Sequence, residues 1–248
     1  MKLISINIET DLHYDTLFPF LENEKPDVIC MQEVIEDQFE MFKNKLGMKG
    51  VFKPCGFSDS GYSRYASTEG KRYGVAIFSK EFIDSGHYYY WGSEDDFKLS
   101  FEEYIKDEKN TENYVFVWVN IKKENGDIYK FVSTHFPATK KGESTPHQLE
   151  ILPPLFEKLD SFDGFVMCGD FNAPRGRETF RRISDKYKDN IPSHYETSID
   201  NKIHRDGVQN ITLMVDGLFT TPAYIAKDVR LVDGVSDHMA VVAEIEKI

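Results

Sequence analysis

Residues 163–174 read DGFVMCGDFNAP and join a short apolar run to a polar turn. The run Phe165–Cys168 is too short for a helix and is bounded by glycines, which predicts a buried strand. Asp170 and Asn172 follow directly, and Pro174 prevents the strand from continuing. Taken alone, these two polar residues indicate a helix N-cap or an Asx turn. A catalytic interpretation depends on what the rest of the chain contributes.

The composition is that of an ordinary globular protein, with 40% hydrophobic and 14% aromatic residues. The 248 residues show no break in composition, which predicts a single domain over residues 1–248. We find no apolar run of membrane-spanning length, and the N-terminus enters a strand pattern without the anatomy of a signal peptide. Three cysteines, Cys30, Cys55 and Cys168, are widely spaced and lack a metal-binding CxxC pair. These features favour a cytoplasmic protein, and they predict no protein partner.

The formal net charge of −12 argues against tight, sequence-tolerant binding of nucleic acid, which normally uses a basic stripe. A phosphate substrate stays compatible with this charge, because a bound metal ion can reverse the local field. Residues 93–113 are rich in Asp and Glu and predict a solvated, partly helical insertion. Residues 54–72 predict a long loop rich in Gly, Ser and Tyr, either a lid over a site or a plain surface insertion.

Hydrophobic patterns predict a chain of alternating strands and helices. We expect strands at residues 2–8, 27–31, 74–78, 86–91, 211–219 and 239–246, with a hairpin of 114–122 and 127–134 around Asn125-Gly126. Helices are expected at residues 15–24, 36–46, 145–160 and near 176–187, with Pro153 and Pro154 delaying or kinking the third. Residues 188–209 are expected to be irregular.

Acids, amides and imidazoles recur where predicted strands end. They are Asn7, Glu9, Glu33, His135, Asp170 and Asn172, with Asp216 inside a predicted strand and Asp237-His238 just before the last one. Each of them alone also fits an ordinary turn, loop or capping role. Their recurrence at five or six strand ends is hard to attribute to chance and favours a common site.

The chemistry of this set is specific. Carboxylates and an amide oxygen are hard ligands that suit Mg²⁺ or Mn²⁺. Zinc is disfavoured because the chain has no HxH or HExxH spacing and no thiolate set. An aspartate beside a histidine suits an oriented imidazole that contacts a phosphoryl oxygen. Metal, water and imidazole together predict hydrolysis of a phosphate ester.

Six motifs resemble those of the endonuclease/exonuclease/phosphatase superfamily, which includes DNase I, neutral sphingomyelinases and the deadenylases. They are SINIE (5–9), MQE (31–33), STHFP (133–137), GDFN (169–172), VDGLF (215–219) and SDH (236–238). The motifs occur in the family's order, and GDFN and SDH are the most specific. The resemblance implies an α/β (α+β) fold, a four-layer αββα sandwich of two packed mixed β-sheets flanked by helices, with the active site at one end.

The resemblance also implies metal ligands and residues that handle the water. Glu33 would be the principal metal ligand, with Asn7 and Glu9 near the same ion. Asp170 would orient or deprotonate the attacking water, and Asn172 would hold the scissile phosphate.

Further implied roles concern the phosphate itself. His238 would contact a phosphate oxygen, with Asp237 as its orienter or as a further metal ligand. His135 would contact the phosphate or the leaving group, and Asp216 would orient His135. The implied reaction is metal-dependent, in-line attack by water on a phosphate ester, a phosphodiester more than a monoester. A nuclease and a catalytically silent scaffold of the same fold are the alternatives.

Four basic side chains near the motifs have two interpretations. Arg175 and Arg177 follow GDFN, and His204 and Arg205 lie in the polar region before the last strands. They can bind a second phosphate or remain solvated.

Overall fold

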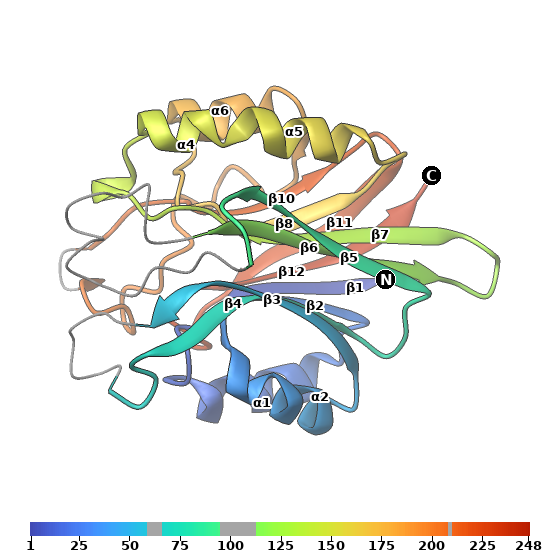
Figure 1. Ribbon diagram of the computed structural model, residues 1–248, viewed down its shortest axis with the longest axis horizontal. Coiled ribbons are helices and arrows are strands. Elements are labelled where there is room, and N and C mark those ends of the chain that lie inside the picture. Colours follow the sequence, from blue (N-terminus) through green and yellow to red (C-terminus); the bar gives the residue numbers. More distant parts are fainter. Residues whose placement is uncertain (59–65, 95–112, 208–209) are drawn as a thin grey trace.

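The computed structural model describes residues 1–58, 66–94, 113–207 and 210–248 and contains two six-stranded sheets packed face to face (Figure 1). In spatial order, the first sheet is β11 (Tyr224–Val232), β12 (Ala240–Lys247), β1 (Lys2–Asn7), β2 (Val28–Ile35), β4 (Lys71–Ser79) and β3 (Lys49–Ser58). The second is β5 (Asp84–Trp91), β6 (Tyr114–Lys122), β7 (Ile128–His135), β8 (Val166–Asp170), β10 (Asp216–Thr220) and β9 (Lys188–Asp189). Both sheets are mixed, because β1–β2 and β7–β8 are parallel and the other pairs are antiparallel.

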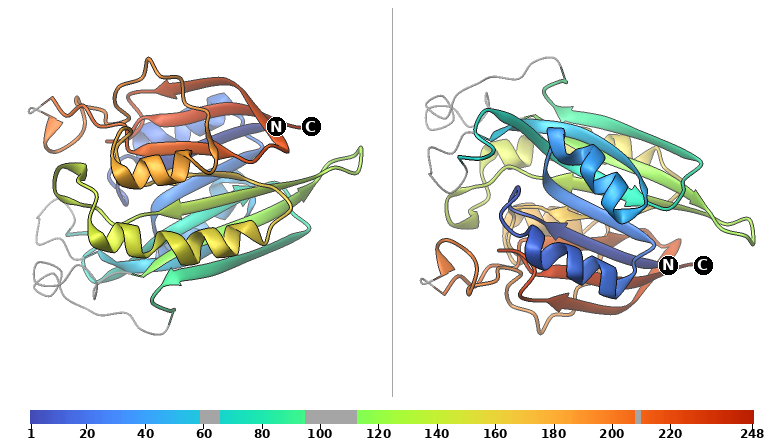
Figure 2. Two further views of the ribbon diagram at one scale, coloured as in Figure 1. Left: turned by 90° about the horizontal axis from the view of Figure 1, so that it is seen from above. Right: turned by 90° about the horizontal axis from the view of Figure 1, so that it is seen from below.

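Helices cover the two outer faces, as the views from above and below show (Figure 2). The first sheet is covered by α1 (Tyr14–Glu24), the 3₁₀ turn η1 (Glu36–Gln38) and α2 (Phe39–Leu46). The second is covered by α4 (Pro146–Glu150), α5 (Leu152–Asp160) and α6 (Glu178–Ser184), with the 3₁₀ turn η3 (Lys140–Gly142) before them. The expected helix at 145–160 is divided between α4 and α5 near its prolines. The predicted αββα sandwich is confirmed.

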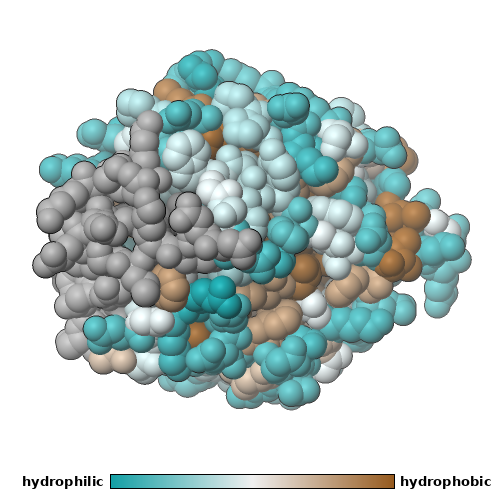
Figure 3. Space-filling model, in the orientation of Figure 1, coloured by the Kyte–Doolittle hydropathy of each residue, from teal (hydrophilic) through white to brown (hydrophobic). Residues whose placement is uncertain are grey.

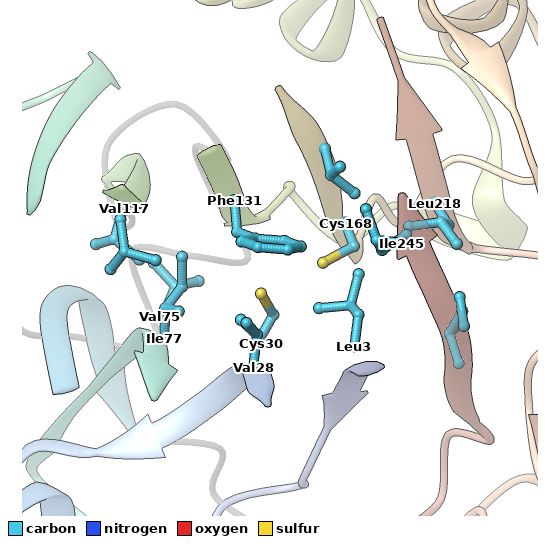
Figure 4. Close-up of a cluster of buried hydrophobic side chains, with 14 of the residues drawn as sticks. Leu3, Val28, Cys30, Val75, Ile77, Val117, Phe131, Cys168, Leu218 and Ile245 are labelled. Atoms are coloured by element: carbon cyan, nitrogen blue, oxygen red, sulfur yellow. The ribbon is translucent and has the colours of Figure 1, made fainter. Parts of the chain in front are cut away.

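The core between the sheets is made of small and branched side chains from both inner faces. Leu3, Val28 and Cys30 of the first sheet face Phe131 and Cys168 of the second, and the two sulfur atoms point into the same space (Figure 4). Both thiols are fully buried and free, as expected for small buried hydrophobes. Dense packing of this kind fixes one sheet against the other, and therefore fixes the strand ends that carry the polar residues.

Parts of the strand prediction were wrong. Residues 54–72 are not one loop, because β3 continues to Ser58 and β4 begins at Lys71, paired in register across a bulge after Pro54. The strand expected over 211–219 begins only at Asp216. The edge strand β11 was missed, since most of its residues are partly exposed and its hydrophobic pattern is weak.

Some expectations fall on residues outside the described ranges. These are the central part of the predicted loop, residues 59–65, and residues 95–112 of the acidic segment.

Among the described residues, no helix combines the length and apolarity needed to cross a membrane. The face seen in Figure 3 is largely polar, and its hydrophobic residues gather in small separate areas.

Strand register places three polar side chains at one edge of the second sheet. His135 on β7 pairs with Asp170 on β8, and Asp170 pairs on its other side with Asp216 on β10. On the first sheet, Asn7 ends β1 beside Gln32 of β2. The facing ends of the two sheets thus carry polar residues of five motifs.

Gly169 permits the close approach of β7 and β8. A Cβ atom at this position would collide with the carbonyl oxygen of Thr134 on the neighbouring strand. Gly169→Ala should therefore lower the free energy of unfolding by about 1–3 kcal/mol, because the parallel pair would have to separate. Urea unfolding measures this, and Gly176→Ala is the control, since Gly176 has a φ of +90° but no atom within 4 Å of the built Cβ. Equal losses in the two variants would contradict the packing explanation.

Candidate active site

Asp170 lies at the centre of the polar cluster and is 1% exposed. Its Oδ1 accepts the backbone N–H of Asn172 at 2.8 Å, which is the Asx turn expected from the sequence. Its Oδ2 accepts a hydrogen bond from Asn7 Nδ2 at 3.2 Å and lies 3.6 Å from His135 Nε2 and 3.7 Å from His238 Nε2. Asp170 can therefore form the turn and belong to the cluster at once, because Oδ1 makes the turn and Oδ2 faces the cluster.

The side chain of Asn7 connects the acids of the two sheets. Its Nδ2 also donates to Glu33 Oε1 at 2.9 Å, and its Oδ1 accepts the backbone N–H of Glu9 at 3.1 Å. Glu9 and Glu33 have positive φ angles of 46° and 62°, which are uncommon for residues other than glycine. Such backbone strain persists only where surrounding contacts enforce it, and it clusters at functional sites.

His238 is held by Asp216. Its Nδ1 lies 2.8 Å from Asp216 Oδ2, so the ring donates from Nδ1 and presents Nε2 to Asp170. The resemblance implied that Asp216 orients His135, whereas the contact seen here joins Asp216 to His238. The implied role of Asp237, as orienter of His238 or as a further metal ligand, stays a prediction. A β-bridge between Ile199 and His238 accompanies this pairing, and the neighbouring Ser198 hydrogen-bonds to the backbone of Asp216.

Ser198 supports this arrangement and was missed by the sequence analysis. Its Oγ accepts the backbone N–H groups of Val215 and Asp216 at 3.1 and 3.0 Å, and its carbonyl accepts the N–H of Met239 at 2.7 Å. No signal marks Ser198 in the sequence, because it lies in a segment that predicts only irregular structure.

Charge within the cluster separates the pKa values of its members. Burial opposes the charged form of His238, but the charges of Asp216 and Asp170 outweigh burial and raise its pKa well above 6.5. Burial alone would raise the pKa of Asp170, yet His238 and His135 lower it to about 2. Burial raises the pKa of Asp216, with His238 opposing it. An ionised Asp170 facing an imidazolium is the result.

His135 and Asn172 lie together on the other side of Asp170. Asn172 Nδ2 donates to the carbonyl of Phe136 at 3.0 Å and lies 3.2 Å from His135 Nε2. The backbone of Asn172 has a φ of 46°, and its carbonyl accepts a hydrogen bond from the buried amide of Gln148 at 3.2 Å. Both the side-chain amide and the backbone of Asn172 are thus fixed by hydrogen bonds.

A second cluster of acids adjoins Asn7. Burial raises the pKa of Asp237 to about 7, with the nearby charges of Glu9 and Glu33 adding to the effect. Three carboxylates and one amide oxygen are a ligand set that a hard divalent cation prefers, and a cation would relieve this repulsion. The residues present therefore fit Mg²⁺ or Mn²⁺.

His13 also belongs to the acidic cluster and was missed by the sequence analysis. Its Nε2 lies 2.7 Å from Glu9 Oε2, and ligand atoms of Glu9, His13 and Asp237 all lie within 4.8 Å of one another. The spacing of four residues between Glu9 and His13 is the one available signal, and it is weak outside a predicted helix.

The basic residues have different environments. Arg175 binds Asp189 at 2.7 Å and the carbonyl of Ile191 at 2.8 Å, which makes a structural role the better interpretation. Arg177 is exposed and precedes α6. Burial, followed by the charges of His238 and Arg205, lowers the pKa of His204.

Solved structures share this fold over nearly the whole chain. An endonuclease/exonuclease/phosphatase from Bacteroides vulgatus is 18% identical with a TM-score of 0.71, covering 100% of this chain and 99% of its own. A mannosyl-6-phosphatase from Bacteroides thetaiotaomicron is 14% identical with a TM-score of 0.66, covering 99% of both chains. The human Nocturnin catalytic domain with bound sulfate is 16% identical with a TM-score of 0.66, covering 100% of this chain and 93% of its own.

The search of curated proteins gave no match. The model of the Endonuclease/Exonuclease/phosphatase family matches residues 4–238, a span that contains every residue of the two clusters. Members of this family are hydrolases that act on phosphate esters and generally depend on a divalent metal. On this match, the chain belongs to the endonuclease/exonuclease/phosphatase family.

Proposed function

We propose that this protein is a Mg²⁺-dependent phosphoesterase that hydrolyses a phosphodiester by in-line attack of an activated water. One observation carries the proposal. The ionised carboxylate of Asp170 lies between the Nε2 atoms of His135 and His238, at 3.6 and 3.7 Å, beside a cluster of hard metal ligands. A base, two imidazoles and a metal site at one strand edge are the parts that phosphate-ester hydrolysis needs.

Asp170 is the residue we assign to the water. Its pKa of about 2 keeps it ionised at neutral pH, so its carboxylate accepts a hydrogen bond from the water and orients it for attack. So low a pKa makes Asp170 a weak base, which favours orientation of the water over its full deprotonation. The hydrogen bonds from Asn172 N–H and Asn7 Nδ2 fix the carboxylate before substrate arrives.

The imidazoles and Asn172 act on the phosphoryl group. His238 is kept protonated by Asp216 and Asp170, and its cationic ring stabilises the charge that develops on a phosphoryl oxygen. Asn172 would hold the phosphate through its side-chain amide, and His135, whose Nε2 lies 3.2 Å from Asn172 Nδ2, would contact the same group or the leaving group. Asp216 acts through His238 as a positioning residue.

We assign metal binding to Asn7, Glu9, Glu33 and Asp237. Mg²⁺, or Mn²⁺ in its place, supplies Lewis-acid neutralisation of the transition state when bound. The amide hydrogen bond from Asn7 Nδ2 to Glu33 orients the principal carboxylate, and its Oδ1 fixes the backbone of Glu9. These contacts support the assignment, since ligands held by further hydrogen bonds bind metal more tightly.

Charge favours a small diester over other phosphates. A phosphodiester carries one negative charge, whereas a monoester carries about 1.5 to 2 at pH 7 and is repelled more by the buried acids. The net charge of −12 also disfavours a nucleic acid, which is a long polyanion. A nuclease stays the second candidate because the family includes nucleases.

Replacement of the water-orienting and phosphate-binding groups should greatly lower turnover. Asp170→Asn and His238→Ala should each lower kcat for bis-p-nitrophenyl phosphate by roughly 10²–10³, the usual cost of one lost electrostatic stabiliser. Asp233→Asn and His194→Ala are matched controls, because both side chains are exposed and outside the clusters. Circular dichroism checks that all four variants fold. Undiminished turnover in both site variants would refute the assignment.

The state of His238 should depend on Asp216. In EDTA-treated protein, the imidazole should stay protonated above pH 6.5, and Asp216→Asn should lower its pKa toward the ordinary value. Two-dimensional NMR of the histidine nitrogens measures both. Because the folded-state pKa is raised, this charge stabilises the fold below pH about 6.5 and the contribution is lost as pH rises through the folded pKa. An unchanged pKa in Asp216→Asn would contradict the ion pair, and Asp233→Asn is the control.

Metal and substrate dependence test the function directly. EDTA-treated wild-type protein should be inactive, and Mg²⁺ should restore hydrolysis of bis-p-nitrophenyl phosphate above that of p-nitrophenyl phosphate, with plasmid DNA left intact. Preference for the monoester would indicate a phosphatase, and nicking of the plasmid a nuclease. Inactivity on all three substrates with Mg²⁺ and Mn²⁺ would support a silent scaffold and overturn the proposal.

A further inference from the structure

The imidazole of His13 lies inside the acidic cluster rather than beside it. Its side chain is 14% exposed and that of Glu9 4%, with 2.7 Å between Nε2 and Oε2. Asp237 completes the group, since one ligand atom from each of the three side chains lies within 4.8 Å of the others. The spread is comparable with about 4.2 Å, the separation of two ligands on opposite sides of one small cation.

The backbone at His13 is fixed relative to Asp237. The carbonyl of His13 accepts the N–H groups of Thr16 and Leu17 at 3.2 and 2.8 Å, which starts α1. Thr16 Oγ1 then donates to the carbonyl of Val235 at 2.7 Å, two residues before Asp237. These hydrogen bonds join the start of α1 to the loop that carries Asp237. The fold itself therefore holds His13 near Asp237.

We propose that His13 is a nitrogen ligand of the ion held by Glu9 and Asp237. This inference rests on the proposed function, because it assigns a further ligand to the same metal site. A simple ion pair between His13 and Glu9 is the competing explanation of the short contact. The two differ in the role of Asp237, which an ion pair does not need and a coordination shell uses.

A nitrogen ligand changes which metal the site prefers. Mg²⁺ takes oxygen ligands and keeps several waters, whereas transition ions bind imidazole well. With His13 in the shell, the site should bind Mn²⁺ more tightly relative to Mg²⁺ than an all-oxygen site does. The metal preference is therefore a property of His13, separate from the four oxygen ligands assigned above.

Electron paramagnetic resonance of bound Mn²⁺ tests the ligand directly. Metal-free protein is loaded with Mn²⁺, and electron spin-echo modulation reports the imidazole nitrogen; Mg²⁺ competition gives the ratio of the two affinities. His13→Gln is the variant, because its amide nitrogen can still donate to Glu9 but offers no imidazole. His194→Gln, an exposed histidine outside both clusters, is the matched control.

The wild type and His194→Gln should show nitrogen modulation that His13→Gln lacks. The Kd for Mn²⁺ should rise roughly tenfold in His13→Gln, with a smaller change for Mg²⁺. Modulation absent from the wild type, or retained in His13→Gln, would overturn the ligand assignment and leave the phosphoesterase proposal intact. Failure of the wild type to bind either ion would instead remove the metal-dependent function, and this inference with it.

Discussion

The side-chain amide of Asn7 is the contact on which the arrangement of this site depends. It ends β1 of one sheet, yet its Nδ2 donates both to Glu33 of the same sheet and to Asp170 of the other. A neutral amide is the group that can lie between two carboxylates without adding charge, since its two N–H bonds serve one acid each. Asp170 is buried and Glu33 is partly exposed, and Asn7 gives each of them one hydrogen bond. Asn7 therefore joins the two sheets at the point where an acid of one lies near an acid of the other.

Strand register extends this constraint across the second sheet. His135, Asp170 and Asp216 lie opposite one another on β7, β8 and β10, so a slip of one residue would turn the carboxylate of Asp170 to the opposite face of the sheet. The inter-sheet core prevents such a slip, because the inner faces are filled by side chains such as Phe131 and Cys168. Packing in the core, well away from the strand ends, thus keeps these three side chains aligned.

Local patterns predicted most of the strands and helices and marked most of the polar residues, and the family resemblance implied the sandwich in which they lie together. GDFN and SDH each combine a strand signal with polar residues, so strand end and candidate residue were visible together. The contact between Asp216 and His238 was not predicted, because these residues lie on separate segments and leave no local pattern that marks their pairing. His13 and Ser198 were missed for the same reason, since each acquires meaning only from a neighbour brought by the fold. The edge strand β11 was missed for a different reason, because its partial exposure weakens the alternation of apolar and polar residues.

The two clusters divide the site by charge. On one side, His238 is cationic and His135 adjoins Asn172. On the other side lie Glu9, Glu33 and Asp237, where burial, with a smaller contribution from the two glutamates, raises the pKa of Asp237 to about 7. Asp170 and Asn7 lie on the boundary between them. Under the proposed function, this division suits a phosphoryl group, since the imidazolium would stabilise charge on its oxygens and a cation held by the acids would neutralise their repulsion. The acidic net charge of the protein is then compatible with an anionic substrate at this point.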